Sequence, residues 1–313
     1  MVDKQGMNER AIEIKNLYKS FKFHLSLRTF RIIKDLSLEA DRGEIYGFIG
    51  PNGAGKTTTI KLIMGLIFPD RGNIRILGQS PYDRKTRARI GFLPENPCFY
   101  EYLTGREFLD FYGRLLGIPS AERKGRSEEL IALVGLSGKE DLQLRKYSRG
   151  MIQRLGFAQV LLNDPELLIL DEPMSSLDPI GRRELRDIII DLRRKGKTIF
   201  FSSHILQDAE MICDRVGIIK DGEIRLQGKL SELLSAKIKF WDVACSNFDP
   251  ESAPIKKHIL SSKDGERLVR IYSEMELNLF IEELGKSGGH VISILPQRET
   301  LEDLFMRKVG EKA

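Results

Sequence analysis

Short, uninterrupted apolar segments alternate with segments of helical spacing along much of the chain. Residues 167–170 and 198–201 are apolar almost throughout, a pattern typical of strands that are buried on both faces of a parallel sheet. Between them, residues 181–194 repeat apolar positions every three or four residues, which predicts a helix. Strand, helix and strand in this order predict an α/β fold.

An antiparallel hairpin is predicted ahead of these elements. Residues 12–17 and 32–38 have the composition of strands, and a basic, aromatic segment at 22–31 joins them. Residues 45–49 then lead into a glycine-rich turn, and residues 56–66 have helical spacing. The N-terminal part therefore predicts an antiparallel β subdomain, followed by a strand, a loop and a helix.

The middle of the chain is predicted to be helical, and the C-terminal part differs from both. Residues 103–116 and 127–136 show helical periodicity, which predicts a helical insertion. After Gly228 we expect a small α+β appendage, with domain boundaries at 11–228 and 229–313. Its predicted strands are 237–245, 268–272 and 290–295, and its predicted helices are 274–284 and 300–309.

The composition excludes several classes of protein. A hydrophobic fraction of 41% and a charged fraction of 30% are ordinary for a soluble globular chain, so disorder and fibrous structure are set aside. No segment approaches the roughly 18 uninterrupted apolar residues of a membrane-spanning helix. Residues 1–10 lack the apolar core of a secretory signal, so the expected compartment is the cytoplasm.

Charge and cysteine content point to no particular partner. The net charge of +5 is spread over interleaved acidic and basic residues, which favours solvated helix faces and gives no reason to expect nucleic acid. The three cysteines, Cys98, Cys213 and Cys245, have no CxxC spacing. We therefore predict reduced core thiols rather than a disulfide framework or a zinc site.

The strongest chemical signal is a glycine-rich loop between a predicted strand and a predicted helix. It fits the phosphate-binding pattern, in which glycines let successive N–H groups point at phosphate oxygens. Lys56 is expected to reach the β and γ phosphates, and Thr57 to bind Mg²⁺. The predicted phosphate-binding residues are Gly50, Pro51, Asn52, Gly53, Ala54, Gly55, Lys56, Thr57 and Thr58.

Two adjacent carboxylates follow the apolar run at 167–170. Asp171 and Glu172 stand at the C-terminal end of this predicted strand, where open α/β sheets bind ligands. Asp171 can hold the Mg²⁺ shell, while Glu172 can act as general base toward an attacking water. Two adjacent carboxylates at the end of a strand more often have no catalytic role. Because a phosphate-binding loop lies upstream, a catalytic role is favoured here.

The segment 147–154 lies between these two motifs and resembles the signature sequence of the ABC ATPases. It keeps Ser148 and Gly150 of the usual Leu-Ser-Gly-Gly-Gln form and departs at Tyr147, Arg149 and Met151. A serine hydroxyl and a glycine N–H at a helix start can hold a γ-phosphate. An N-capped helix beginning at Ser148 is compatible with this role. The expected fold class is thus a P-loop NTPase core of the ABC type.

The resemblance covers about residues 12–228 and implies roles for further residues. Phe21 matches the aromatic position that stacks on adenine, with Tyr18 as the alternative. Glu95 stands where the family usually has a glutamine near the metal and the water, a departure known from the exporter branch. Asp178 matches the loop that contacts the second subunit. His204 matches the switch histidine near the γ-phosphate and Glu172.

The resemblance also implies partners. ATP is expected to lie between the two subunits of a homodimer, each with a complete set of site residues. The helical insertion, about 96–159, is expected to meet an integral membrane permease subunit, with the aromatic segment 98–103 either receiving it or packing inside the insertion. The chain would then power transport, with export favoured, and would be peripheral on the inner face of the cell membrane. The appendage resembles the C-terminal extension of exporter-type ATPases and is interpreted as dimer support or regulation.

Two other functions remain open from the sequence. Soluble ABC ATPases act on ribosomes or nucleic acid, but such proteins usually have two cassettes, long coiled coils or zinc insertions, and this chain has one phosphate loop and no metal-ligand spacing. An adaptor could bind ATP without hydrolysing it. Glu172 and His204 argue against this, because a pure switch needs neither. The basic segment 22–31 could touch lipid or a partner, although a solvated loop is favoured.

Overall fold

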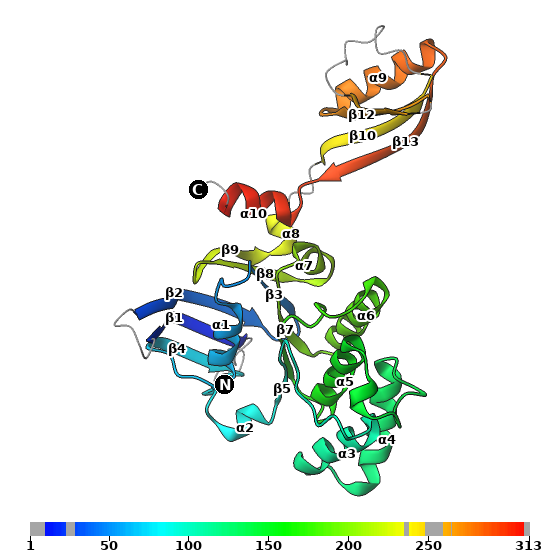
Figure 1. Ribbon diagram of the computed structural model, residues 1–313. Coiled ribbons are helices and arrows are strands. Elements are labelled where there is room, and N and C mark those ends of the chain that lie inside the picture. Colours follow the sequence, from blue (N-terminus) through cyan, green and yellow to red (C-terminus); the bar gives the residue numbers. More distant parts are fainter. Residues whose placement is uncertain (1–9, 23–28, 235–237, 248–258, 264, 310–313) are drawn as a thin grey trace, which may run out of the picture. The chain divides into compact units, whose positions relative to one another are not determined.

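The predicted parallel strands form the centre of a six-stranded sheet in the computed structural model (Figure 1). Five strands are parallel and β9 pairs antiparallel with β8 at one edge. Every residue of the three central strands is buried, which explains why these strands are mostly apolar in the sequence. The strand order is β5 (Ile90–Leu93), β6 (Leu167–Leu170), β7 (Thr198–Ser203), β3 (Ile45–Ile49), β8 (Arg215–Lys220) and β9 (Glu223–Lys229).

The structure describes residues 10–22, 29–234, 238–247, 259–263 and 265–309. The chain divides into two compact units, one up to Leu230 and one from Ser231 onward. Most of the predicted linking segment at 22–31 lies outside the described residues. Among the residues described, no helix is both long and apolar enough to cross a membrane.

The predicted antiparallel subdomain is a three-stranded sheet in the order β2-β1-β4. β1 (Arg10–Lys22) pairs with β2 (Thr29–Asp41) and with β4 (Arg71–Ile76), so the hairpin is confirmed and its strands are longer than the pattern indicated. β4 was not predicted, because only Ile74 and Ile76 of this strand are buried.

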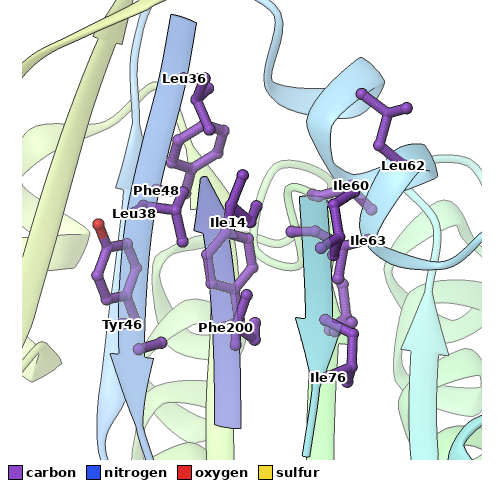
Figure 2. Packing of buried hydrophobic residues seen from close by; sticks show 14 of the residues in the cluster. Ile14, Leu36, Leu38, Tyr46, Phe48, Ile60, Leu62, Ile63, Ile76 and Phe200 are labelled. Carbon is purple, nitrogen blue, oxygen red and sulfur yellow. The ribbon is translucent and has the colours of Figure 1, made fainter. Parts of the chain in front are cut away.

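The two sheets of the first unit share one core (Figure 2). Ile14, Leu38 and Ile76 from the antiparallel sheet pack in one cluster with Phe48 and Phe200 from the parallel sheet. The Phe200 ring stacks on Tyr46 at a centroid distance of 5.4 Å. Burial of large apolar side chains is the main stabilising contribution here, at roughly 1.5–3 kcal/mol for each side chain. This core holds the parallel strand ends in fixed positions.

The predicted helical insertion is present as three mutually contacting α-helices and one short 3₁₀ turn. Thr104 and Glu107 form a capping box that starts α3. α4 begins seven residues earlier than predicted, because its first turns are polar and exposed and so lack apolar periodicity. The elements are α3 (Gly105–Leu115), α4 (Ser120–Leu133), η1 (Leu144–Lys146) and α5 (Arg149–Leu161).

Among the remaining helices of the first unit, α6 and α7 contact parallel strands, whereas α1 contacts β2 and β4 of the antiparallel sheet. α1 ends three residues before the predicted boundary, since Gly65 adopts a left-handed conformation with φ of 64°. α6 has Pro179 in its first turn and Asp178 as its N-cap. The bounds are α1 (Lys56–Ile63), α2 (Arg84–Arg87), α6 (Pro179–Arg194) and α7 (Leu206–Ile212); α8 (Leu230–Leu233) follows β9.

The second unit is a four-stranded antiparallel sheet with a helix packed against it. Val243 and Val269 of the sheet are buried with Phe280 of the helix. The small α+β character agrees with the sequence pattern, and β11 is the strand that the pattern missed. The elements are β10 (Ile238–Ser246), β11 (Ile259–Lys263), β12 (Glu266–Ile271), α9 (Glu274–Lys286), β13 (His290–Arg298) and α10 (Leu301–Val309).

The prediction of three core thiols is wrong for one cysteine. Cys213 and Cys245 are buried, but Cys98 is exposed in the irregular segment that follows β5. No regular element surrounds Cys98, so its position in an apolar, aromatic sequence did not lead to burial. All three cysteines are free thiols, as expected.

Candidate nucleotide site

The glycine-rich loop turns tightly between β3 and α1. Gly53 and Gly55 have φ values of 79° and 110°, a conformation that favours glycine. A Cβ atom on Gly50 would lie 2.3 Å from the carbonyl oxygen of Ile219, so no larger residue fits there. The loop therefore needs its glycines for geometric reasons, and it ends at the N-terminus of an α-helix, which favours anions.

The side chain of Lys56 is folded into this loop. Its ammonium donates hydrogen bonds to the carbonyl oxygens of Gly50 at 2.7 Å and Pro51 at 3.3 Å. It also lies 3.2 Å from Oε1 of Glu172, an ion pair that lacks hydrogen-bond geometry. Because Lys56 is only 6% exposed, its charge is held at a fixed point beside the loop.

The two carboxylates that follow β6 are held from the neighbouring strand β7. The hydroxyl of Ser202 donates to Oδ1 of Asp171 at 2.6 Å and accepts from the backbone N–H of Glu172 at 2.9 Å. Glu172 has a φ of 50°, a left-handed conformation that costs energy for a residue with a side chain. Such strain is found most often at functional sites, and here Ser202 helps to hold it.

Burial raises the pKa of Asp171, although hydrogen bonds from Ser202 and Thr57 and the nearby Lys56 partly offset this effect. The hydrogen bond from Thr57 also shows that the first turn of α1 meets the end of β6. A hydroxyl and a carboxylate are both oxygen ligands of the kind that Mg²⁺ takes. The structure thus brings together Thr57 and Asp171, two of the three residues predicted as metal ligands, and the third, Glu95, lies with Thr57 in the lining of one cleft.

His204 completes the contacts of Glu172. Its Nδ1 lies 2.9 Å from Oε2 of Glu172, directly after the end of β7. Glu172 therefore has Lys56 on one carboxylate oxygen and His204 on the other. This arrangement can hold the carboxylate in one orientation toward a substrate water, as a general base requires.

A cleft of about 390 Å³ collects most of the predicted residues. Glu95 lies in its lining together with Glu172 and His204, so three strands deliver polar side chains to one place. Ile32 also lines the cleft and was not predicted. The loop residues in its lining are Pro51, Asn52, Gly53, Gly55, Lys56, Thr57 and Thr58.

The residues of the signature segment lie in a different groove. Ser148 is the N-cap of α5 and accepts a hydrogen bond from the N–H of Met151 at 3.2 Å, as predicted. Gly150 follows it in the first turn. Asp178 caps α6, and its Oδ1 accepts from the N–H of Gly181 at 2.7 Å. All three line a second groove, of about 950 Å³, so one chain presents two separate surfaces.

The predicted adenine-stacking residue is not in the lining of the cleft. Phe21 stands near the end of β1, is 41% exposed and has the ammonium of Lys19 at 5.3 Å from its ring centroid. Tyr18, the alternative, is half-buried, and its interaction with Asp35 adds to the desolvation that raises its pKa.

Ser202 is a polar residue of the site that the sequence interpretation missed. It is fully buried and touches both carboxylate residues, yet it stands at the end of an apolar run that was assigned only a structural role. The sequence contained one signal for this role, because Ser202 and Ser203 are polar residues at the end of an otherwise mostly apolar strand. Asp171 directly follows the other predicted apolar strand. Two polar residues at the end of a buried strand indicate partners at the sheet edge.

These features define a nucleotide site of the P-loop type, and comparisons with known proteins give its family. The family model for ABC transporters matches residues 33–175. An uncharacterised ABC transporter ATP-binding protein of Synechocystis is 42% identical over 90% of this chain and 79% of its own length. The bacitracin transport ATP-binding protein of Bacillus licheniformis is 38% identical over 89% and 92%.

Solved structures agree. The ATP-binding subunit of an ABC transporter superimposes with a TM-score of 0.63 at 34% identity, covering 71% of this chain and 91% of that one. A dimeric ATP-binding cassette in a post-hydrolysis state with ADP and Pi gives a TM-score of 0.65 at 25% identity, covering 70% and 98%. The chain therefore belongs to the ABC transporter ATP-binding proteins. It is an ATP-binding and ATP-hydrolysing transporter subunit, and the predicted fold class and function are confirmed.

The raised pKa of Asp171 leads to a prediction about stability. The folded chain binds the proton of the Asp171 carboxyl more tightly than the unfolded chain does. The ionised carboxylate therefore lowers the free energy of unfolding at pH values above the raised pKa. This destabilisation is lost as the pH falls through the raised pKa toward the pKa of the unfolded chain. Asp171→Asn is expected to raise the melting temperature of the nucleotide-free chain by a few degrees at pH 8. The difference in melting temperature between this variant and the wild type becomes smaller as the pH is lowered.

The matched control is Asp83→Asn. A backbone hydrogen bond from Lys85 is the main cause that lowers the pKa of Asp83, so the sign is opposite and no stabilisation is expected there. Thermal unfolding followed by circular dichroism between pH 5 and 8 measures both variants. A lower melting temperature for Asp171→Asn at pH 8 would show that the buried carboxylate is stabilising as it stands.

Proposed function

We propose that this chain is the motor of an export system and that it hydrolyses Mg²⁺-ATP in the cleft described above. The observation that carries the proposal is the Glu172 carboxylate, which is fixed between Lys56 and His204. A general base must be positioned within hydrogen-bond reach of the water that it activates. Holding both of its oxygens from opposite sides supplies this positioning.

The residues of the loop bind and orient the phosphates. Lys56 supplies a positive charge for the β and γ phosphates, and backbone N–H groups between Asn52 and Thr58 supply hydrogen-bond donors. Thr57 and Asp171 would hold Mg²⁺, which offsets negative charge that develops during phosphoryl transfer. Their oxygen donors and the buried carboxylate fit a divalent cation, since a cation would relieve the cost of burying Asp171.

Glu95 is proposed to orient the water or the metal from the strand next to that of Glu172. It follows β5, the edge strand that pairs with β6, so it lies one strand away from Glu172. A carboxylate there brings more negative charge than the usual glutamine. Phe21 is proposed to stack on adenine, supported by its exposed ring at the end of a strand, with Tyr18 as the alternative.

A homodimer with ATP at its interface is proposed because the site residues lie on two surfaces of one chain. Lys56, Glu172 and His204 line the cleft, while Ser148 and Asp178 line the second groove. Ser148 and Gly150 at the start of α5 can bind the γ-phosphate of ATP held by a second copy. The dimeric cassette to which this chain is similar supports this arrangement.

An aromatic surface on the helical insertion is proposed to bind the membrane permease. Tyr100 and Tyr102 are 50% and 68% exposed, and the ring of Tyr100 also contacts that of Phe111. Phe99 instead packs inward on Phe108 at 4.2 Å. Of the two alternatives for segment 98–103, packing inside the insertion describes Phe99. Binding of the permease is proposed for the exposed tyrosines, which form a surface suited to an apolar helix.

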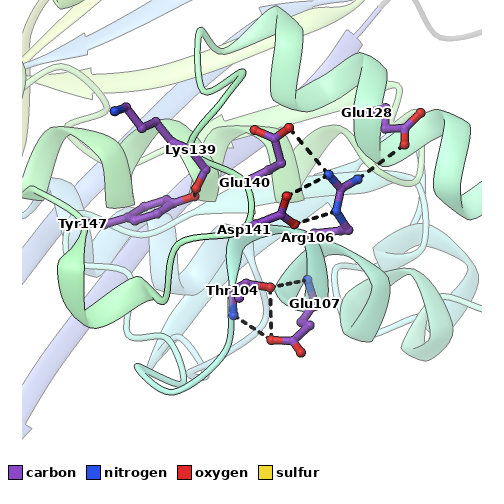
Figure 3. A network of polar contacts seen from close by, with 8 residues as sticks. All are labelled: Thr104, Arg106, Glu107, Glu128, Lys139, Glu140, Asp141 and Tyr147. Atoms are coloured by element: carbon purple, nitrogen blue, oxygen red, sulfur yellow. Dashed lines mark hydrogen bonds and ion pairs between the residues drawn. The ribbon is translucent and has the colours of Figure 1, made fainter.

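Contacts within the helical insertion join this aromatic surface to the signature segment. The guanidinium of Arg106, at the start of α3, contacts Glu128, Glu140 and Asp141 (Figure 3). Backbone hydrogen bonds also connect the segment 101–106 with the segment 140–145, which directly precedes Ser148. A permease that presses on the tyrosines would therefore act on a rigid unit that includes the signature residues.

The names of similar proteins support our proposals for the direction of transport and for the location. Similar proteins are named for bacitracin transport and linearmycin resistance, which favours export here as well. The chain is then peripheral on the inner face of the cell membrane through its permease. The unit from Ser231 onward is proposed to support or regulate the dimer, and no nucleic acid is expected as partner.

Glu172→Gln is expected to lower kcat for ATP hydrolysis by at least about 100-fold, because the amide cannot accept the proton of the attacking water. ATP binding is retained, since the amide has almost the same shape. The matched control is Glu166→Gln, an exposed glutamate just before β6 that pairs with Arg89, and its kcat stays within about twofold. Phosphate release measures both. Unchanged hydrolysis in Glu172→Gln would exclude this carboxylate as the base.

Replacing both Tyr100 and Tyr102 by serine is expected to lower recovery of the permease by about tenfold or more, because exposed aromatic anchors dominate interface energies. The tagged chain is purified from its native membranes, and the amount of co-purifying polytopic membrane protein is measured. Tyr272→Ser, at a tyrosine that is 54% exposed in the other unit, is the matched control. Recovery of ribosomes or nucleic acid without a membrane protein would favour the alternative function.

A further inference from the structure

A largely buried ion pair joins α6 to α7, the helix that begins two residues after His204. Nη1 of Arg186 in α6 is 3.0 Å from Oδ1 of Asp208 in α7. The Asp208 side chain is 5% exposed and that of Arg186 16% exposed. Among the described residues, Oδ2 of Asp208 has no hydrogen-bond partner. It lies in a small space that Ser175, Ile205 and Glu172 also line.

The pair connects the two segments that carry the proposed switch residues. α7 starts two residues after His204, and Asp208 is in its first turn. α6 starts at Asp178, its N-cap. The loop between Glu172 and Asp178 is bonded to Glu172 itself, because both the N–H and the hydroxyl of Ser175 donate to the Glu172 carbonyl oxygen. The Arg186 to Asp208 contact therefore closes a ring of contacts from Glu172 through α6 to α7 and back to His204.

The position of His204 depends on α7, because little else holds the imidazole. Its side chain is 43% exposed, and the contact that fixes it is the 2.9 Å hydrogen bond with Glu172. α7 has seven residues and no side-chain N-cap. At its start the N–H of Ile205 donates to the hydroxyl of Ser203, and Asp208 provides the charged contact. A shift of α7 would move His204 away from Glu172.

We propose that Arg186 and Asp208 are positioning residues for ATP hydrolysis: together they hold α7 so that His204 stays on the Glu172 carboxylate. A buried ion pair is weak evidence for stability, since apolar residues of similar volume often stabilise as well. Its charges instead specify one relative orientation of the two helices. Because a displacement of about 1 Å can cost about 100-fold in rate, such an orientation has a direct effect on kcat.

A second ion pair gives an internal control. Arg193, two turns further along α6, makes two hydrogen bonds with Asp214, which follows α7, at 2.7 and 3.1 Å. This pair also joins α6 to the region of α7, but it lies at the end far from His204 and its side chains are 43% and 34% exposed. If kcat depended only on the attachment of α6 to α7, breaking either ion pair would lower it. If kcat depends on the position of His204, only breaking the pair of Arg186 and Asp208 lowers it.

The test is a mutant cycle on ATP hydrolysis by the full chain, and it rests on the proposed function of Glu172 and His204. Asp208→Asn and Arg186→Met are each expected to lower kcat about tenfold, with KM for ATP within about twofold of the wild type. Arg193→Met leaves kcat within about twofold. Arg186→Lys keeps the charge and recovers part of the lost rate, and it also serves if the other variants fail to fold.

The decisive comparison uses the His204→Ala background. If the ion pair acts through His204, adding Asp208→Asn there changes kcat by less than about twofold. The proposal is overturned if Asp208→Asn has wild-type kcat, or if it multiplies the loss in His204→Ala by the same tenfold factor. Failure of the proposed function looks different, because the wild-type chain would then show no hydrolysis that Glu172→Gln removes.

Discussion

The site depends on one constraint: the ends of three parallel strands must keep a fixed register. Lys56 is positioned by the loop after β3, Glu172 by the end of β6 and His204 by the end of β7, and these strands are neighbours or next neighbours in one sheet. β6 and β7 pair from Leu167 with Thr198 to Leu170 with Phe201, which places Ser202 beside Asp171. A slip by one residue would turn these side chains to opposite faces of the sheet.

The apolar core supplies the rigidity that this register needs. The site contains a buried ammonium, two buried carboxylates and a left-handed residue, and each of them is unfavourable by itself. They persist because the strands that lead to them are fully buried and share one apolar cluster, which includes Phe48, Phe200 and Ile60 of α1. The stabilising apolar core thus lies along the strands, while the polar site residues lie at their carboxyl ends. The nucleotide and the metal would relieve part of the unfavourable charge burial.

Much of the fold and of the candidate site could be predicted from the sequence where the signal comes from residues close together in the chain. The loop from Gly50 to Thr58 is contiguous and its conformation follows from its glycines, and Asp171 and Glu172 directly follow an apolar run. The missed features depend on contacts between distant residues. Ser202 acquires its role only through the pairing of β6 with β7, and Arg186 meets Asp208 across two helices. β4 and the first half of α4 were missed because they expose most of their side chains, which weakens the periodic signal.

The separation of the site residues over two surfaces has the largest consequence for the proposed function, because the proposed roles of Ser148 and Gly150 need a second copy of the chain. The most direct measurement is the mass in solution of the Glu172→Gln variant by light scattering, with and without Mg²⁺-ATP. The account predicts twice the 35.7 kDa of one chain with ATP and a return to the mass of one chain when Ser148 is also replaced by arginine. A variant that binds ATP and keeps the mass of one chain would contradict it.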